Sequence, residues 1–338
     1  MTTLTGPGGP PAPTLDGVAF RLYRSLDDIA GMAAANARQR AHAGVLAPID
    51  IERMRNHYRH LENSDATTDC LLAQVRGETI GYARCEWHDL HDGDRSLDTT
   101  VVVDPAHWGR GVIRALLAWS ERRLREVERT LPRGPRTWFA TEVFGGDGEP
   151  LTAARELGYE VVRPWAEMLR STLAGPLPDD TLPPGYTWLT LDASGSRAVW
   201  EMLNATFAEH WGEWSAGDDA YLEWVNDPVQ DPALWVAATD GSAIASIVLN
   251  IVNDLPDGSR RGELSTVGTH PDHRRRGLAR ACIARSLRVL REHGATSAWL
   301  GVDLLNENEA PSLYESCGFE VVTRGFTLRR PFDTEEGR

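Results

Sequence analysis

The chain has 338 residues, of which 41% are hydrophobic and 25% charged. These proportions suit a globular protein of two ordinary domains and exclude a disordered chain, a collagen and a small disulfide scaffold. The formal net charge of −14 is a poor match for nucleic acid or anionic lipid, so we expect neither as a partner. The sign suits a cationic partner such as an amine.

Two residue types limit the chemistry further. All 35 basic residues are arginine, which excludes a P-loop NTPase, a lysine Schiff base and a catalytic lysine. The four cysteines, Cys70, Cys85, Cys282 and Cys317, lack the spacing of a zinc or redox pair. We therefore expect no metal, and a protein of the reducing cytoplasm. No apolar run reaches the length of a membrane span.

The chain contains an internal repeat. Residues 100–114 and 266–280 share Pro, His, Arg, Gly and Arg at a constant offset of 166 positions. Residues 157–162 and 317–322 match at an offset of 160 positions. Because both blocks recur in the same order, we infer a duplicated domain.

Composition suggests the domain boundaries. Residues 1–14, rich in Gly, Pro and Thr, are typical of a flexible tail, and residues 174–185 hold four prolines that a helix or central strand would not tolerate. We therefore place the first domain at 15–173, a linker at 174–185 and the second domain at 186–332.

Periodicity in the second copy predicts an α/β unit, with a mostly antiparallel front and a strand–helix–strand crossover behind it. The predicted elements in chain order are a strand at 186–191, a helix at 197–207, strands at 234–238 and 244–252 joined by the Asp240–Gly241 turn, a strand at 264–269, a helix from Gly277 to about Gly294, a strand at 299–304, a helix at 310–316 and a strand at 319–323.

The segment 273–279 lies where a strand ends and the long helix begins. A helix N-terminus presents unpaired backbone N–H groups and a positive dipole end, and small residues let a phosphate approach closely. Three arginines add positive charge, so the segment suggests a pyrophosphate site. On the arginine run alone, a solvated basic turn is the alternative.

Two motifs resemble those of the GCN5-related N-acetyltransferases, or GNAT family. Arg274, Gly277 and Ala279 match its Arg/Gln-x-x-Gly-x-Gly/Ala motif, and Asn306 with residues 313–319 resembles its Asn…Leu-Tyr-Glu-x-x-Gly-Phe block. The resemblance covers the second domain and, through the repeat, the first. It implies an α/β fold of two tandem GNAT-type domains, each a mixed, mostly antiparallel sheet flanked by helices, with acetyl-CoA as cosubstrate.

The same resemblance implies the coenzyme-binding residues. In the family the strand before the turn pairs with the pantetheine arm, the turn holds the pyrophosphate, and an asparagine contacts the arm. Carried over, these residues are Val267, Gly268, Thr269, Arg274, Arg275, Arg276, Gly277, Leu278, Ala279, Arg280 and Asn306.

The first copy departs from the motif. Trp108 stands in place of Arg274, Ile113 replaces Ala279, and Tyr314 has no clear counterpart. We expect the first domain to bind acetyl-CoA poorly or not at all and to act structurally. Retention of a second CoA as a structural ligand is the alternative.

Acetyl transfer to an amine needs a base, donors for the tetrahedral oxyanion, and a proton for the leaving thiolate. The backbone N–H groups near residues 267–269 are the candidate oxyanion donors. Glu263 is the candidate base, because its surroundings are similar to those of mycothiol synthases, which are tandem family members with a degenerate first copy. Tyr314 is the candidate acid. The alternatives are a Glu on an exposed strand edge and a half-buried packing aromatic.

Acceptor binding is expected after the first helix of the second domain, where the family places such residues. There His210, Trp211 and Glu213 could hold a cationic amine by charge and cation–π contact, although core or interface packing is an alternative for the tryptophans.

The sequence thus predicts a cytoplasmic N-acetyltransferase, monomer or homodimer. It would move an acetyl group from acetyl-CoA to a primary amine of a small molecule, in a ternary complex on the C-terminal domain. A peptide or protein N-acetyltransferase and a non-catalytic CoA- or amine-binding module are the alternatives.

Overall fold

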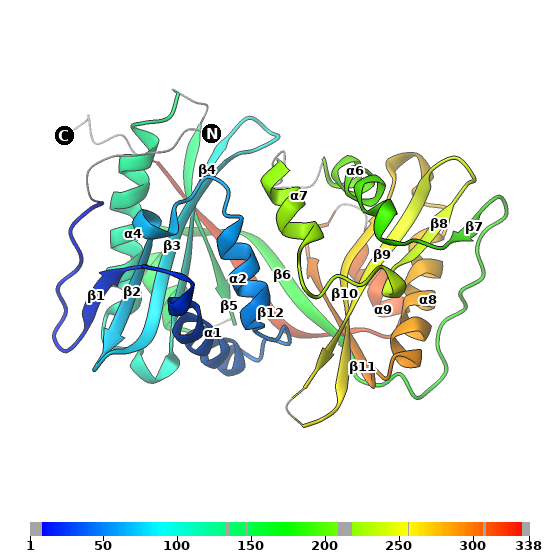
Figure 1. Cartoon of the computed structure of the whole chain (residues 1–338), viewed down its shortest axis with the longest axis horizontal. Coiled ribbons are helices and arrows are strands. Elements are labelled where there is room, and N and C mark those ends of the chain that lie inside the picture. The colour runs from blue at the N-terminus through cyan, green and yellow to red at the C-terminus, as the bar shows by residue number, and fades with distance from the viewer. Residues whose placement is uncertain are drawn as a thin grey trace. The chain divides into compact units, whose positions relative to one another are not determined.

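The computed structural model describes residues 9–132, 136–145, 148–208, 218–255, 257–306 and 309–332. The chain forms two compact units (Figure 1). Unit 1 comprises Met1–Pro164 with Thr323–Arg338, and unit 2 comprises Trp165–Val322. The predicted α/β class and mostly antiparallel sheets are confirmed in both units.

The sheet of unit 1 is antiparallel except for one parallel pair, β4 with β5. Its strands in spatial order are β1 (Ala19–Leu22), β2 (Cys70–Val75), β3 (Glu78–Asp89), β4 (Arg95–Val103), β5 (Thr137–Phe144) and β12 (Glu320–Pro331). Successive side chains of a strand point to opposite faces of the sheet, so each face can pack against its own layer of helices.

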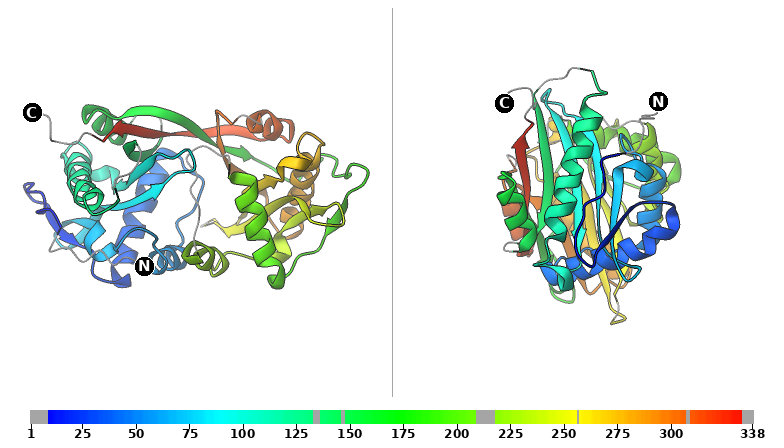
Figure 2. Two further views of the ribbon diagram at one scale, coloured as in Figure 1. Left: turned by 90° about the horizontal axis from the view of Figure 1, so that it is seen from above. Right: turned by 90° about the vertical axis from the view of Figure 1, so that its left-hand side faces the viewer.

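The helices of unit 1 cover both faces of this sheet. They are α1 (Ile29–Ala43), α2 (Ile51–Arg59), α3 (Ala66–Asp69), α4 (Val112–Glu128) and α5 (Glu149–Glu156). Helix α4 packs across β3 and β4, as the right-hand view of Figure 2 shows. The core beneath it contains Leu97, Leu116, Trp119 and Phe139, and a second cluster lies under α1.

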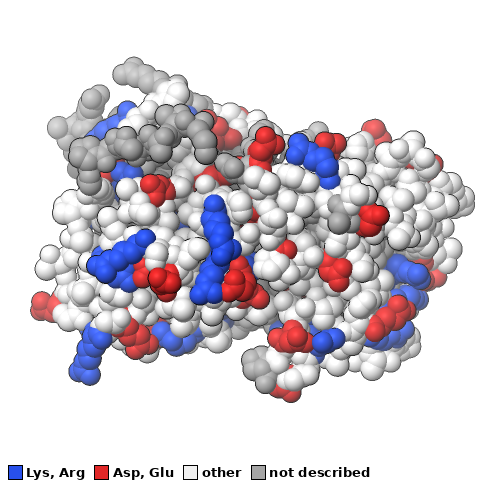
Figure 3. Space-filling model, viewed as in Figure 1, with Lys and Arg blue, Asp and Glu red and all other residues white. Residues whose placement is uncertain are grey.

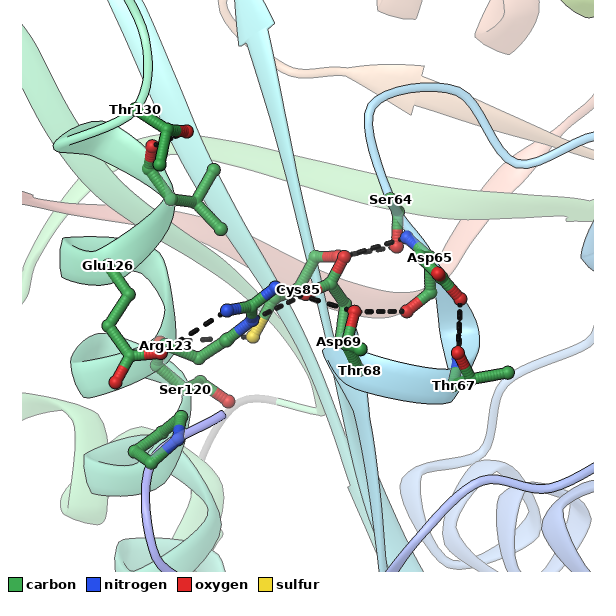
Figure 4. Close-up of polar contacts among 12 residues, drawn as sticks. Ser64, Asp65, Thr67, Thr68, Asp69, Cys85, Ser120, Arg123, Glu126 and Thr130 are labelled. Carbon is green, nitrogen blue, oxygen red and sulfur yellow. Dashed lines mark hydrogen bonds and ion pairs between the residues drawn. The ribbon is translucent and has the colours of Figure 1, made fainter. Parts of the chain in front are cut away.

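Polar contacts fasten α4 to its neighbours. Arg123 Nε donates to Asp69 Oδ1 over 2.6 Å, and Asp69 Oδ2 accepts from the backbone N–H of Asp65 over 2.7 Å (Figure 4). On the same helix, the Trp119 indole N–H donates to the Pro10 carbonyl over 3.2 Å. The segment 1–14, expected to be a flexible tail, is therefore anchored at Pro10, while residues 1–8 lie outside the described residues.

The sheet of unit 2 repeats the same plan. Its strands in spatial order are β6 (Glu160–Arg170), β11 (Ser297–Asp303), β10 (Arg260–Thr269), β9 (Ile244–Asp254), β8 (Val236–Thr239) and β7 (Thr187–Leu189). Its helices are α6 (Ser196–Phe207), α7 (Asp218–Val225), α8 (Leu278–Glu292) and α9 (Ala310–Ser316). The elements predicted for the second copy are found in the predicted order. Helix α7 was not predicted, and the last strand continues to Pro331.

The last strands of the two sequence copies are exchanged. Strand β6 ends the first copy but pairs with β11 in unit 2, where Met168 lies opposite Leu300. Strand β12 ends the second copy but pairs with β5 in unit 1, where Leu328 lies opposite Thr141. The compact units therefore differ from the sequential ranges 15–173 and 186–332. Both strands begin with Glu-Val-Val, so either matches the local pattern that the sheet edge requires.

The proline-rich segment 174–185 contains no helix or strand and lies along α8. Arg288 Nη1 donates to the Pro178 carbonyl over 2.7 Å, and Arg285 pairs with Asp180 at 3.4 Å. Leu173, just before the segment, is buried in the core of unit 2. The linker is thus part of the packing of unit 2.

Arginine and acidic side chains are interspersed on the face drawn in Figure 3. Within the described ranges, no helix is both long and apolar enough to cross a bilayer. Over those same residues, His, Cys, Asp and Glu side chains form no group of three suited to a metal ion. All four cysteines are free and buried.

Candidate active site

In unit 2 the end of β10 leads through a short 3-10 helix, Pro271–His273, into α8. Gly277 caps α8 in the left-handed region with φ +86°, a conformation that a residue with a Cβ adopts only at a cost. Leu278 is buried and anchors the first turn of α8 in the core. The free N–H groups of that turn therefore stand at the surface, where an anion can reach them.

The three arginines of this turn have separate partners. Arg274 donates through Nε to the Thr269 carbonyl over 3.3 Å and through Nη2 to the Thr206 carbonyl over 3.0 Å. Arg275 pairs with Glu309 at 3.1 Å, and Arg276 donates to the Tyr186 hydroxyl over 2.7 Å. These contacts fasten the turn to β10, α6, α9 and the segment before β7. Arg280 is exposed and Ala279 half-buried.

Unit 1 builds the same turn from other residues. A 3-10 helix at Pro105–His107 precedes Gly111, which caps α4 with φ +77°. Trp108 Nε1 donates to the Val103 carbonyl over 3.0 Å. The backbone N–H of Gly109 donates to the carboxylate of Glu149. In unit 1 the turn therefore already holds a carboxylate of its own chain.

Strands β10 and β11 separate in the middle of the sheet. Their parallel pairing runs from Arg261 opposite Ser297 to Glu263 opposite Trp299 and ends there. A register shift on the β9 side, between Leu264 and Thr266, marks a β-bulge at the same point. Beyond it, β10 keeps its pairing with β9 while its other edge faces an opening between the strands.

The alternation of a strand determines which backbone N–H groups along this edge of β10 point into the opening. The N–H of His270 donates to the Ala245 carbonyl on the β9 side. Alternate residues of a strand direct their N–H groups to opposite sides, so those of Val267 and Thr269 point into the opening. Gly268 is buried against α6, where an added Cβ would lie 3.4 Å from Leu203 and Thr206.

In unit 1 the corresponding strands separate later and without a bulge. Its parallel pair β4–β5 extends one residue further, to Thr99 opposite Thr141, and the Thr141 hydroxyl donates to the Thr99 carbonyl over 2.8 Å. The β3–β4 ladder runs from Gly81 to Asp89 without a register shift. Beyond Thr99, β4 runs on to Val103 without pairing to β5, so the free strand edge offered to an extended ligand is shorter in unit 1 than in unit 2.

Glu263 lies at the point where β10 and β11 separate. Its neighbour Gly262 faces α8, since an added Cβ would lie 2.6 Å from Leu290, so Glu263 faces away from α8. Its side chain is buried, and its Oε2 accepts from Asn253 Nδ2 on β9 over 3.3 Å. The alternative of a Glu on an exposed strand edge is therefore wrong, because β10 is an interior strand.

Tyr314 lies in α9 with 7% of its surface exposed, its ring edge-on to Phe319 at 6.3 Å. Burial raises the pKa of Tyr314 to about 12, so the hydroxyl keeps its proton. Asn306 stands in the turn between β11 and α9, where its backbone N–H donates to the Asp303 carbonyl over 3.2 Å.

The predicted acceptor residues, His210, Trp211 and Glu213, lie outside the described residues. On the α6 side of that gap, Trp200 packs against Trp224 of α7 at 5.5 Å, and Trp224 stacks on Trp235 at 5.6 Å. These three tryptophans hold α7 against the core of unit 2.

Comparison with known proteins identifies the family. The sequence profile of the Acetyltransferase (GNAT) family matches residues 46–133 and 197–319. A mycothiol acetyltransferase of Thermobispora bispora is 30% identical over 77% of this chain and 83% of its own length. One of Thermomonospora curvata is 34% identical over 74% of this chain and 78% of its own length. The chain belongs to the GNAT acetyltransferase family.

Solved structures show the same GNAT fold in tandem. A GCN5-related N-acetyltransferase of Sphaerobacter thermophilus superposes with a TM-score of 0.70 at 22% identity, covering 95% of this chain and 97% of that one. A tandem GNAT protein from the clavulanic acid biosynthesis pathway gives 0.67 at 14% identity, covering 94% and 100%. The family profile and the sequence relatives make the chain a GNAT acyltransferase, and the family implies acetyl-CoA as cosubstrate.

The features of unit 2 fit that coenzyme: an open strand edge for an extended arm, next to a helix N-terminus for its phosphates. In unit 1 of this GNAT protein, the free edge of β4 is shorter, and Glu149 engages the turn. The bulge after Glu263 lies where the opening begins, and no residue type in the sequence predicts it.

Sequence reasoning also missed the counterpart of Glu263 in the first GNAT copy. The bulge adds one residue to β10, so the offset of 166 positions falls to 165 before it, and Asp98 corresponds to Glu263. Asp98 lies opposite Glu86 and accepts a 3.0 Å hydrogen bond from Ser96. Burial, with the charge of Glu86, raises the pKa of Asp98 to about 7.

Proposed function

We propose that unit 2 transfers an acetyl group from acetyl-CoA to the primary amine of a small molecule. The observation that carries this proposal is the opening between β10 and β11, with Glu263 at its closed end and the Gly277 turn at its open end. The relatives named mycothiol acetyltransferases support a small-molecule acceptor.

In this proposal the coenzyme supplies a thioester, which is an activated acetyl group. The backbone of Val267 and Thr269 pairs with the pantetheine arm as an added strand would. The N–H groups from Gly277 to Arg280 hold the diphosphate. Arg274 acts through the shape of the turn, because its guanidinium is committed to the Thr269 and Thr206 carbonyls.

Glu263 takes the proton that the ammonium of the acceptor must lose before attack, directly or through water. The carboxylate is suited to this because the amide of Asn253 donates to one of its oxygens and so favours its ionised form. The amine nitrogen then bonds to the thioester carbon, whose oxygen is stabilised by β10 backbone N–H groups.

The carbon–sulfur bond breaks next, and the leaving thiolate receives a proton from Tyr314. The second proton, which the nitrogen loses as the amide forms, restores the Tyr314 hydroxyl through water. Direct transfer in a ternary complex is favoured over an acetylated cysteine. Burial raises the pKa of Cys282 to about 12 and also raises that of Cys317, which keeps these two thiols of unit 2 protonated. The chain also has no lysine that could carry the acetyl group.

The test is release of free CoA thiol from acetyl-CoA in the presence of different amines. We expect turnover with the cysteinyl derivative of a glycosylated inositol or another small primary amine, and initial-rate lines that intersect. Parallel lines would indicate a covalent acetyl-enzyme. Turnover confined to peptides, or none with any amine, would overturn the proposal.

Glu263→Gln provides the matched control for coenzyme binding. It keeps the side-chain volume and a hydrogen-bond acceptor but removes the base. Calorimetry with acetyl-CoA should give an affinity close to that of the wild type, while turnover falls at least about 100-fold. Loss of both together would instead indicate that Glu263 supports the fold of the site.

A further inference from the structure

Strand β6, which the first sequence copy contributes to unit 2, carries a buried carboxylate. Glu167 has 4% of its surface exposed. Its neighbours Ala166 and Met168 belong to the hydrophobic core beneath α8. Because side chains alternate along a strand, Glu167 projects from the opposite face of the sheet, the face that carries Glu263.

Register places Glu167 next to an open position. Glu167 lies directly opposite Gly301 on β11, and a Cβ built on Gly301 meets no atom within 4 Å. Gly301 is exposed although Leu300 and Val302 on either side of it are buried. A glycine in the middle of a strand weakens it, so an unfilled position there calls for another reason, such as close approach of a ligand.

Trp299 lies between the two carboxylates on the same face. It pairs with Glu263 on β10 and with Leu169 on β6. The side chain is 6% exposed, and its indole N–H is buried with no hydrogen-bond partner among the described residues. A buried donor without an acceptor is costly and rare in folded proteins, so it is an independent indication of a ligand.

In unit 1 a side chain occupies the position that corresponds to Gly301. The pair corresponding to Gly301–Glu167 is Glu142–Thr327, whose side chains contact each other at 3.4 Å. There the carboxylate stands on the middle strand and fills the space. In unit 2 the carboxylate stands on the exchanged strand, and the space above β11 is left free.

We propose that Glu167 is a specificity-determining residue, which binds a second hydrogen-bond donor of the acceptor, a hydroxyl or an ammonium group, in the space over Gly301. This rests on the proposed function. Strand spacings put the Cα atoms of Glu167 and Glu263 about 12 Å apart. A small acceptor can therefore reach Glu167 with one group while its amine meets Glu263. The acceptor site would then be incomplete without a strand of the first copy.

The first test uses steady-state kinetics of the full chain, with the small amine that the wild type acetylates most rapidly. Glu167→Ala should raise KM for that amine at least about tenfold, because a charge-assisted hydrogen bond is lost. KM for acetyl-CoA and kcat should stay close to the wild-type values. Glu160→Gln, at the exposed start of the same strand, is the matched control and should change nothing.

Glu167→Gln distinguishes the two kinds of donor. A hydroxyl still finds an acceptor in the amide oxygen, so KM would stay near the wild-type value. An ammonium loses its counter-charge, so KM would rise as in Glu167→Ala. Unchanged KM for the amine in both variants would overturn the proposal, as would a change confined to acetyl-CoA.

Gly301→Leu gives a readout that a purely structural role would not produce. Gly301 has no positive φ, so the added side chain should not destabilise the strand. We expect an unchanged or higher melting temperature together with an amine KM raised about tenfold or more. Gly175→Leu, at another open glycine of unit 2, is the control. Wild-type kinetics in Gly301→Leu would overturn the proposal, whereas a wild type that acetylates no amine would overturn the proposed function itself.

Discussion

Trp108 and Arg274 occupy equivalent positions in the two copies, and each donates a hydrogen bond to the carbonyl five residues before it. The acceptors are Val103, at 3.0 Å, and Thr269, at 3.3 Å. The indole and the guanidinium thus stabilise the same turn. The first copy lacks the positive charge of Arg274 but has the same turn conformation.

This equivalence makes the two capping glycines a matched pair. Gly111 and Gly277 both have φ near +80° and no side chain pressing on them. Valine at either position should cost about 1–2 kcal/mol in backbone strain. Only Gly277→Val should also abolish acetyl-CoA binding by calorimetry and reduce turnover about 100-fold. Equal loss of turnover in Gly111→Val would show that unit 1 binds the coenzyme in catalysis.

Asn253 should act as a positioning residue for Glu263. Its amide donates to the carboxylate, so Asn253→Ala should make proton uptake by Glu263 easier. The acidic limb of the kcat/KM profile should move to higher pH by about half a unit to one unit. Asn253→Asp should move it further, since a second carboxylate adjoins the first. A uniform decrease at every pH would instead indicate a structural role.

Tyr314→Phe should separate catalysis from packing. Phenylalanine keeps the ring contact with Phe319, so the melting temperature should hold. The value of kcat should fall about 10- to 100-fold with KM for acetyl-CoA little changed, because the thiolate loses its proton donor. Tyr23→Phe, at a buried tyrosine of unit 1, should leave kcat unchanged. Wild-type kcat in Tyr314→Phe would exclude the acid role.

Asp98 should make the stability of the protein depend on pH. Its pKa is raised from an ordinary value of 3.8 to about 7 in the folded chain, mainly by burial. The protonated carboxyl therefore contributes stability that is complete below about pH 4 and is lost as the pH rises through about 7. Asp98→Asn keeps a neutral side chain at every pH.

The measurement is urea unfolding of wild type and Asp98→Asn at about pH 5 and pH 8. The free energy of unfolding of the variant should gain about 1–3 kcal/mol over that of the wild type between these two pH values, because the raised pKa of Asp98 is lost in the variant. Asp16→Asn, at an exposed carboxylate, should show no such gain. An equal effect of Asp98→Asn at both pH values would contradict the assignment.

The sequence by itself determined the duplication, the order of elements in the second copy and the turn at Gly277. A local sequence pattern indicates each of these: repeated motifs, apolar periodicity, and a glycine at a left-handed helix cap. The sequence also suggested Glu263 as the candidate base, through the similarity of its surroundings to those of mycothiol synthases.

Only the tertiary structure decided which strands pair and where they separate. The exchange of β6 and β12 depends on sheet edges distant in sequence, so it moved Glu167 out of the expected range of the catalytic domain. The bulge after Glu263 depends on pairing with β9, and it shifts the alignment of Asp98 by one residue. Long-range pairing leaves no local trace in the chain, because the same alternating residues fit either partner.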